Sequence, residues 1–470
     1  MRQREAVRFG WVLVTAAVLA GCGGGERRGG TGGETTTAAR AGGESAGAPG
    51  AAAAAASACP GGSAGLTLPA GFCATIFADS VGEARHVTVA PNGDVFVALQ
   101  ATEPSPEERA AGERQQPQQA AVIALRDTSR DGRADVIARI PGTGNTGIGI
   151  HAGRLYVDEG HRIVRWRLSP DSLAPAGKPE VVVSGIPLQP GHVARNFVIG
   201  ADGALFLNVG SATNSCQRKD RTTGSPGVDP CTELRTRAGI WRFDANELNQ
   251  RFTPEARWAT GIRNTMGIAY GPDGKLYATQ HGRDQFYQNW AKIFPDPKYS
   301  AENPAEELVQ VNQHDDFGWP YCYYAMDQKK LVDAPEYGGD GKKTDRCASK
   351  KGPVAVFPAH WAPMSLLFYS GTQFPARYRN GAFIAMHGSW NRAPEPQEGY
   401  RVVFQPLKDG QAGGEFETFA NGFADEPPAR LQPGNAKHRP VGLAQGPDGA
   451  LYVTDDAGGR VYRITYTGGK

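Results

Sequence analysis

Cationic and imidazole side chains recur at equivalent places in this sequence, just before or after short segments that alternate apolar and small residues. They are His192 with Arg195, Arg263 with Asn264, Gly282 with Arg283, His387 with Arg392, and Lys437 with Arg439. A cluster of desolvated arginines is costly without counter-charge, so an anionic ligand is the natural partner. Planar guanidinium groups suit carboxylates, because each can donate two parallel hydrogen bonds. The pattern therefore predicts an anion site where these loops meet.

Each of these residues adjoins a unit that occurs six times. The unit has one or two apolar residues, a turn with Asn-Gly, Asp-Gly or a similar pair, and then three or four alternating apolar and small residues. Such a turn between alternating hydrophobic residues indicates a type I′ hairpin of two antiparallel strands. The six copies occupy residues 89–97, 149–157, 199–207, 270–278, 378–385 and 445–453.

No copy of this hairpin can bury both faces of its sheet alone, so the copies must stack around an axis. The sequence therefore predicts an all-β fold, a six-bladed β-propeller of four-stranded antiparallel blades, over residues 59–470. Residues 459–467 provide a closing strand after the last copy. Propeller sites usually lie at one mouth of the central channel, where the cationic loops would converge.

Charge and composition narrow the classes of function. The sequence has 50 Lys plus Arg against 48 Asp plus Glu. Without a basic excess to displace counterions from phosphates, a nucleic-acid partner is not expected.

Residues 127–135 space their carboxylates like the start of a calcium loop. Thr128 and Arg130 stand where further oxygen ligands are needed, so a surface turn is the stronger interpretation.

The N-terminal residues 1–21 have the pattern of an export signal. Three early arginines precede an apolar run at 11–20 that is too short to span a bilayer stably. Leu-Ala-Gly-Cys at 19–22 resembles a bacterial lipoprotein signal, which implies cleavage before Cys22 and acylation of its thiol. Residues 22–58 are rich in Gly and Ala and predict a flexible tether. We expect an exported lipoprotein on the periplasmic side of the envelope. Its lipid alone should anchor it to a membrane, and the outer membrane is the preferred location.

Six cysteines remain once Cys22 is set aside, and six cysteines permit fifteen pairings. Because short loops close at the least entropic cost, sequence-local pairs are favoured. Because disulfides persist in oxidising environments, we expect the protein to function in an oxidising compartment. No Cys-x-x-Cys occurs, so zinc and covalent haem lack a site. The expected disulfides are Cys59–Cys73, Cys216–Cys231 and Cys322–Cys347.

Several motifs occur in an order that is more specific than the repeats. They are His192 before a strand, Arg263-Asn264 in GIRNTMGIAYGPDGKLYATQHG, Gly318-Trp319-Pro320 in FGWPYCYY, and Lys437-His-Arg439 before GPDGALYVTDD. Over roughly residues 65–468 the chain resembles the soluble quinoprotein glucose/sorbosone dehydrogenase family, nearest its sorbosone-dehydrogenase-like and aldose-sugar-dehydrogenase members. The resemblance implies a propeller that holds pyrroloquinoline quinone (PQQ) and Ca²⁺ at its channel mouth. It also implies oxidation of the C1 hydroxyl of an aldose to a lactone, with electrons passed to an external acceptor.

The resemblance assigns roles to the two residues nearest the chemistry. His192 would be the general base that takes the proton of the sugar hydroxyl, work that suits an imidazole. Arg263 would stabilise charge on the quinone oxygens, with Asn264 beside it.

The same resemblance implies how cofactor and metal are bound. Lys437 and Arg439 would bind the carboxylates of PQQ. The glucose-dehydrogenase members carry a cofactor-binding lysine where this chain has His387, so His387 or Arg392 would make that contact. Main-chain carbonyls, from Gly282 and Arg283, would hold the Ca²⁺ as a Lewis acid.

Two other classes of function fit the same scaffold. A lactonase-type propeller hydrolase would bind Ca²⁺ through Glu, Asn and Asp side chains from several blades, whereas this mouth is basic. A non-catalytic propeller would bind a protein or glycan partner, since a fold alone does not determine a function. Binding of PQQ separates the dehydrogenase from both.

Overall fold

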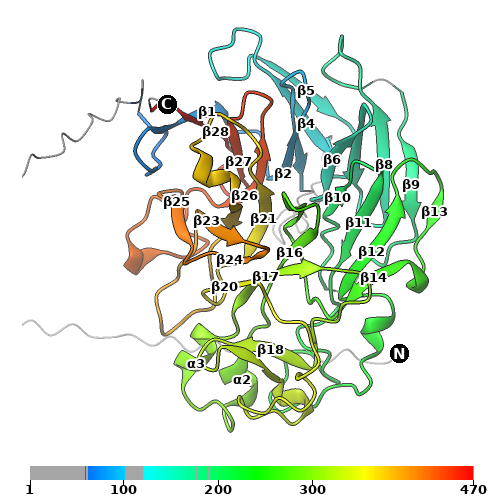
Figure 1. Ribbon diagram of the computed structural model, residues 1–470, viewed down its shortest axis with the longest axis vertical. Coiled ribbons are helices and arrows are strands. Elements are labelled where there is room, and N and C mark those ends of the chain that lie inside the picture. Colours follow the sequence, from blue (N-terminus) through cyan, green and yellow to red (C-terminus); the bar gives the residue numbers. More distant parts are fainter. Residues whose placement is uncertain (1–58, 60–61, 101–119, 176, 189–190, 469–470) are drawn as a thin grey trace, which may run out of the picture. The chain divides into compact units, whose positions relative to one another are not determined.

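Six antiparallel sheets surround a common axis, as the sequence predicts (Figure 1). This computed structural model describes residues 59, 62–100, 120–175, 177–188 and 191–468. The predicted signal and tether, including Cys22, lie outside the described residues. The innermost strands of the six blades, in chain order, are β2, β6, β10, β15, β21 and β26.

The first three blades follow the chain from the inside outward. Blade one has β2 (Ala84–Val89), β3 (Val95–Leu99), β4 (Val122–Arg126) and β5 (Val136–Ile140). Blade two has β6 (Ile148–His151), β7 (Arg154–Asp158), β8 (Arg162–Arg167) and β9 (Glu180–Ser184), and β13 (Gln250–Arg251) pairs parallel with β9. Blade three has β10 (Phe197–Ile199), β11 (Ala204–Val209), β12 (Gly239–Asp244) and β14 (Arg257–Thr260).

The last three blades include the long connections of blade four and the closure. Blade four has β15 (Ile268–Tyr270), β16 (Leu276–Gln280), β17 (Glu306–Val311) and β20 (Ala355–Phe357). Blade five has β21 (Pro363–Phe368), β22 (Gly381–Met386), β23 (Arg401–Lys408) and β25 (Glu417–Ala420), with β24 (Gln411–Ala412) beside β23. Blade six has β26 (Pro440–Gln445), β27 (Leu451–Asp455), β28 (Val461–Tyr466) and β1 (Phe72–Ala78).

The ring closes between sequence-distant strands, because β1 is the outermost strand of blade six. It pairs antiparallel with β28, with Phe72 opposite Tyr466 and Ala74 opposite Ile464. The predicted closing strand at 459–467 is therefore present as β28, and β1 completes the blade beside it. The Cys59–Cys73 disulfide lies at this closure.

Five of the six predicted hairpins join the first two strands of their blades, and in four of these five the turn type differs from the prediction. In blade one the amide of Gly93 donates to the Ala90 carbonyl at 2.9 Å, and Gly93 alone among the turn residues has positive φ, at 94°. This is a type I turn followed by a left-handed glycine, not type I′. The turns of blades three, four and six repeat it at Gly203, Gly274 and Gly449.

Blades two and five differ from that arrangement. In blade two both turn residues have positive φ, Ala152 at 46° and Gly153 at 69°, as a type I′ turn requires. In blade five, residues 369–380 separate β21 from β22, so the fifth copy is not a tight hairpin. A 3₁₀-helix at Ala376–Arg379 lies there; the others span Thr232–Arg235, Pro254–Ala256, Pro335–Tyr337 and Pro428–Arg430.

Two long connections of blade four pack together. The one from β16 to β17 carries both described α-helices, α2 (Phe286–Trp290) and α3 (Pro297–Glu302), and the one from β17 to β20 carries the hairpin of β18 (Cys322–Ala325) and β19 (Lys330–Asp333). Buried aromatic side chains, including Phe286, Phe294 and Tyr323, hold them together. The predicted Cys322–Cys347 disulfide is present here, Cys216–Cys231 lies in the connection between β11 and β12 of blade three, and Cys59–Cys73 lies at the closure. No helix in the described part of the chain is long and apolar enough to cross a membrane.

The loop at 127–135 has the geometry of a surface turn. The Asp127 carboxylate accepts hydrogen bonds from the amides of Arg130, at 2.6 Å, and Gly132, at 2.8 Å. The Asp135 carboxylate accepts from Thr128 and Ser129. Because both carboxylates are turned to local N–H and O–H groups, the turn is explained without an ion.

Candidate functional site

The polar loops singled out in the sequence meet at one end of the ring, where the innermost strands begin; we call this end the mouth. In an antiparallel blade, the start of the first strand and the end of the second lie together. Accordingly the amide of His192 donates to Ser211, that of Ser211 to Arg263, and that of His281 to Asn264, at 2.8 to 3.0 Å. These bonds join the loops of blades three and four into one wall.

His192 is fixed in one tautomer by this wall. Its Nδ1 atom lies 3.0 Å from the Ser211 carbonyl oxygen and 3.1 Å from the Ser211 hydroxyl. Since a carbonyl only accepts, Nδ1 carries the hydrogen and Nε2 keeps a lone pair. Burial first, and then the charge of Arg263, lower the pKa of His192 to about 3. The free chain therefore holds a neutral imidazole with Nε2 as an acceptor.

The main chain around His192 is braced from inside by Arg195. The fully buried Arg195 guanidinium donates to the carbonyls of His192, at 2.7 Å, and Ala194, at 3.2 Å. Its amide donates to the buried Asp158 carboxylate at 2.9 Å. Arg195 therefore positions the histidine loop and does not lie among the groups open to a ligand.

Arg263 is held across the mouth wall by four hydrogen bonds. Its guanidinium donates to the Asn214 carbonyl and side-chain oxygens, both at 3.1 Å, to the Gly282 carbonyl at 2.9 Å, and to Asp284 at 3.3 Å. Asn264 follows it and accepts from Asn208 at 3.3 Å. The buried charge is thus fixed in place before any ligand arrives.

Asp284 is the counter-charge of this first cluster, and the sequence motifs assign it no role. Its carboxylate also accepts from Arg221 at 3.0 Å and from Asn391 at 2.7 Å. Burial alone would raise the pKa of Asp284, but Arg263, His360 and Arg221 outweigh it and lower that pKa to about 2. A permanent carboxylate therefore lies beside Arg263.

A second charged cluster lies where blades five, six and one meet. The Asp456 carboxylate bridges His387, whose Nε2 is 2.8 Å away, and Arg85, whose Nη1 is 2.6 Å away. Arg439 donates to the His387 carbonyl at 3.2 Å and to the Gly388 carbonyl at 3.0 Å. Sequence reasoning named His387 and Arg439 but missed Arg85 and assigned no role to Asp456. Arg85 precedes the first hairpin as Arg263 precedes the fourth, so the same recurrence could have identified it.

This mouth belongs to a ring that matches one known family model from residue 66 to residue 467, the model described as TrAA12-like. The chain belongs to the TrAA12-like family. Among the curated relatives is the PQQ-dependent pyranose dehydrogenase of Coprinopsis cinerea, 27% identical over 361 residues, which are 68% of this chain and 46% of that protein. An uncharacterized protein of Borreliella burgdorferi is 28% identical over 47% of this chain and 51% of its own length. The chain thus spans about half the length of the curated relatives it matches.

Solved structures share the fold of this TrAA12-like chain. The holo form of the C. cinerea pyranose dehydrogenase PQQ domain superposes with a TM-score of 0.67 at 20% identity, covering 85% of this chain and 97% of that one. A calcium structure of the Trichoderma reesei family AA12 enzyme gives 0.67 at 17% identity, covering 86% and 97%. The PQQ-bound aldose sugar dehydrogenase of Streptomyces coelicolor gives 0.51 at 16% identity, covering 85% and 99%.

Three residues that the sequence assigned to this TrAA12-like site have other partners. Arg392 is buried and donates to the carbonyls of Ala301 and Ala359, at 3.0 and 3.1 Å. The Lys437 side chain is 61% exposed and pairs with Asp425. The Arg283 guanidinium forms a buried ion pair with Glu336, a contact that leaves its main-chain carbonyl, the atom assigned to Ca²⁺, unaffected. These contacts hold the three side chains outside the two charged clusters.

The groups that remain fit a polycarboxylate better than they fit a metal alone. Arg85 is buried, and its Nε atom has no hydrogen-bond partner in the described part of the chain, so it can donate to a ligand. For Ca²⁺ the mouth offers the Gly282 carbonyl and the Asp284 carboxylate, both also bonded to Arg263. Within residues that the structure describes, the one three-ligand group of His, Cys or acidic side chains is Cys322, Asp333 and Cys347, whose cysteines form a disulfide.

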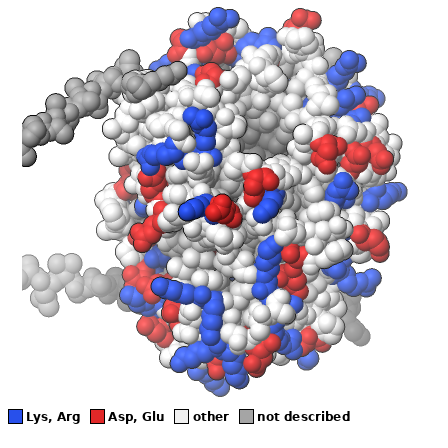
Figure 2. Space-filling view, viewed as in Figure 1, with Lys and Arg blue, Asp and Glu red and all other residues white. Residues whose placement is uncertain are grey.

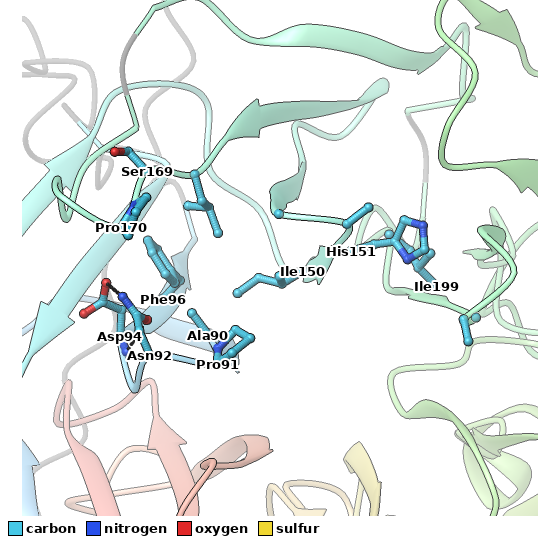
Figure 3. Close-up of a pocket in the computed structure, with 15 residues that line it drawn as sticks. Ala90, Pro91, Asn92, Asp94, Phe96, Ile150, His151, Ser169, Pro170 and Ile199 are labelled. Carbon is cyan, nitrogen blue, oxygen red and sulfur yellow. Dashed lines mark hydrogen bonds between the residues drawn. The ribbon is translucent and has the colours of Figure 1, made fainter.

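A pocket of about 570 Å³ lies at the opposite end of the ring, near the hairpin turns of blades one to three (Figure 3). Ala90, Phe96, Ile150 and Ile199 line it, and Asp94 and Asn92 lie at one side. It contains none of the residues of the two charged clusters.

On the face in Figure 2, acidic and basic side chains lie interspersed. The candidate site is therefore identified by its fixed charges and not by the volume of a cavity.

Proposed function

We propose that this chain is a PQQ-dependent dehydrogenase that oxidises the C1 hydroxyl of a pyranose or related aldose to a lactone. The observation that carries the proposal is His192, a neutral imidazole with Nδ1 bound to Ser211 and Nε2 left as an acceptor, near the buried charge of Arg263. A proton acceptor and a fixed cation are the pair that oxidation of an alcohol by hydride loss requires. The named C. cinerea relative supports the same reaction class.

Arg85, Arg439 and Arg263 would bind the three carboxylates and the quinone oxygens of PQQ. Gly282 and Asp284 would contribute oxygen ligands to Ca²⁺. When bound, the quinone supplies a hydride acceptor and the calcium ion a Lewis acid. The counter-ions Asp284 and Asp456 hold Arg263 and Arg85 in place from within the chain.

In the proposed reaction His192 Nε2 accepts the proton of the C1 hydroxyl while the C1 hydrogen leaves as hydride, and the C1–O bond becomes a carbonyl. Ser211 and Arg195 keep the imidazole in the acceptor tautomer and at its position. Negative charge bound near Arg263 would offset the repulsion that lowers the pKa of His192. The chain thus gains its best proton acceptor when the anionic ligand is bound.

We also propose that the electrons pass to an external acceptor and that the protein is an exported lipoprotein. The second proposal rests on the Leu-Ala-Gly-Cys motif at 19–22 and on three disulfides, which form in oxidising compartments. In that setting the sugar would be oxidised on the periplasmic side of the envelope.

The test uses the full chain, purified in detergent without cofactor. PQQ binding in the presence of Ca²⁺ is measured by calorimetry, and reduction of an artificial acceptor is followed across a panel of aldoses. We expect saturable PQQ binding and sugar-dependent reduction, both lost in Arg263→Ala and kept in Arg377→Ala, which removes an exposed arginine that pairs with Glu417. Failure of the folded chain to bind PQQ would overturn the proposal and leave a binding propeller as the better account.

A further inference from the structure

Trp390 is the most exposed large apolar side chain of the described residues, with 61% of its surface open. The other exposed ones are Val136, Ile137, Leu188, Leu248 and Tyr287. A single exposed apolar residue needs no explanation where it lies on a variable surface. Trp390 lies instead in the loop after β22, which supplies His387 to the second charged cluster.

This loop touches both clusters on either side of the tryptophan. Two residues before it, the Gly388 carbonyl accepts from Arg439 at 3.0 Å, and three residues before it, the His387 ring contacts Asp456 at 2.8 Å. Immediately after it, the Asn391 amide donates to Asp284 at 2.7 Å. Trp390 is therefore the exposed apolar residue in the segment that links the two groups of charges.

The loop is also held rigidly, so the indole is presented on a fixed support. Ser389 is fully buried, its amide donates to the Glu398 carbonyl at 2.8 Å, and its carbonyl accepts from the Tyr400 hydroxyl at 2.6 Å. Two residues after the tryptophan, the buried Arg392 is fixed by the Ala301 and Ala359 carbonyls. A large apolar ring held open to water by fixed neighbours is pre-organised for contact with a ligand.

Asn391 adds a polar atom to the same place. Its side-chain oxygen is buried and has no hydrogen-bond partner in the described part of the chain, while its amide group is committed to Asp284. Buried acceptors are rarely left without a donor. A flat apolar ring next to an unpaired acceptor matches a pyranose, which has C–H groups across its face and hydroxyl donors at its edge.

We infer that Trp390 and Asn391 form the subsite for the sugar ring, with the indole packed against the C–H face of a pyranose and Asn391 Oδ1 accepting from one of its hydroxyls. This inference rests on the proposed function, because it places the pyranose between the two charged clusters. It makes Trp390 a determinant of sugar affinity and leaves cofactor binding to the arginines.

The test compares Trp390→Ala and Trp390→Phe with Ile137→Ala, a matched control on β5 that removes an exposed apolar side chain from blade one. In the full chain loaded with PQQ and Ca²⁺, we expect Trp390→Ala to raise KM for D-glucose and other pyranoses about tenfold, with kcat changed less than twofold. Trp390→Phe should recover most of the affinity. The Kd for PQQ should stay within twofold in all three variants.

A second readout does not depend on turnover. Titration of the cofactor-free chain with a pyranose should change the tryptophan fluorescence of the wild type and of Ile137→Ala but not that of Trp390→Ala. An unchanged KM in Trp390→Ala together with a persisting fluorescence change would overturn the subsite. A rise in KM for the electron acceptor alone would overturn it too and make Trp390 an acceptor contact. If wild type binds no PQQ, the proposed function fails, and the fluorescence titration still decides the subsite.

Discussion

The Nδ1 atom of His192 lies 3.0 Å from the main-chain oxygen of Ser211, which fixes the imidazole with its Nε2 lone pair available. Replacement by glutamine keeps a polar side chain of similar size but removes the basic nitrogen. We expect His192→Gln to bind PQQ with unchanged affinity and to lose about 10²-fold in turnover. Calorimetry and steady-state kinetics check the two effects separately. Equal losses of binding and turnover would instead assign His192 to cofactor contact or to folding.

The charge state of His192 gives a prediction for the chain without cofactor. Burial and Arg263 lower its pKa to about 3, so the ring should stay neutral at every pH above about 4. Binding of PQQ beside Arg263 should raise this pKa, because the anion favours the imidazolium. Ring nitrogen chemical shifts, recorded against pH with and without PQQ, measure both states. Titration near pH 6.5 in the free chain would contradict the burial argument.

Arg439 and Lys437 are two residues apart but lie in different surroundings, so they form a matched pair. Arg439 lies in the second cluster, on the carbonyls of His387 and Gly388, whereas Lys437 pairs with Asp425 at the surface. We expect Arg439→Ala to raise the Kd for PQQ at least tenfold and Lys437→Ala to change it less than twofold. Calorimetry at equal ionic strength measures both. A larger effect for Lys437 would restore the role that the sequence resemblance gave it.

Glu307 predicts a pH dependence of stability. Burial raises the pKa of this carboxyl to about 8, although Gln280 donates to it at 3.1 Å. The folded chain then keeps a proton that the unfolded chain releases above its ordinary pKa of about 4.5, so stability falls as pH rises from there to about 8. The loss at pH 8 is on the order of 4 kcal/mol. Glu307→Gln cannot ionise at this position, so the variant should not lose this stability as pH rises.

Thermal unfolding should therefore give Glu307→Gln a higher Tm than wild type at pH 8 and a similar Tm at pH 5. Glu417→Gln is the control, because Glu417 pairs with Arg377 at the surface. Because Glu417→Gln keeps the buried Glu307, its Tm should fall from pH 5 to pH 8 as that of wild type does. A constant difference for Glu307→Gln at both pH values would show that the carboxyl is ionised in the fold.

The predicted acylation of Cys22 determines whether the protein is found in the membrane fraction or in the soluble fraction. If the thiol is acylated, Cys22→Ala should move the chain from the membrane fraction to the soluble fraction and abolish labelling by a fatty-acid analogue. The three disulfides should form equally in both proteins. Membrane association that persists in Cys22→Ala would mean a different anchor.

Six hairpin signals predicted six blades, and five of them mark the tight connection between the two inner strands of a blade, whereas residues 369–380 separate these strands in blade five. The turn type was not predictable from Asn-Gly or Asp-Gly alone, since those pairs satisfy both type I′ turns and a type I turn with a left-handed glycine. At Gly93 the strand register selects the second form. Cysteine pairing was predictable for a simpler reason, that each partner lies close in sequence.

The candidate site was predictable only in part. Recurrence along the repeat placed His192, Arg263, His387 and Arg439 at one mouth. It could not place Arg392, whose guanidinium is bound by the carbonyls of Ala301 and Ala359 from distant parts of the chain. Competition among such partners depends on tertiary contacts that no local pattern encodes.

The pairing of β1 with β28 gives the ring a single seam made from strands almost four hundred residues apart, since Phe72 lies opposite Tyr466. A growing chain can build blades one to five from neighbouring segments, but it cannot finish blade six until β28 has been made. During that interval β1 has unpaired main-chain groups and a row of apolar side chains, the features by which strands join other chains. The late strand β28 thus protects the early strand β1 from misassembly.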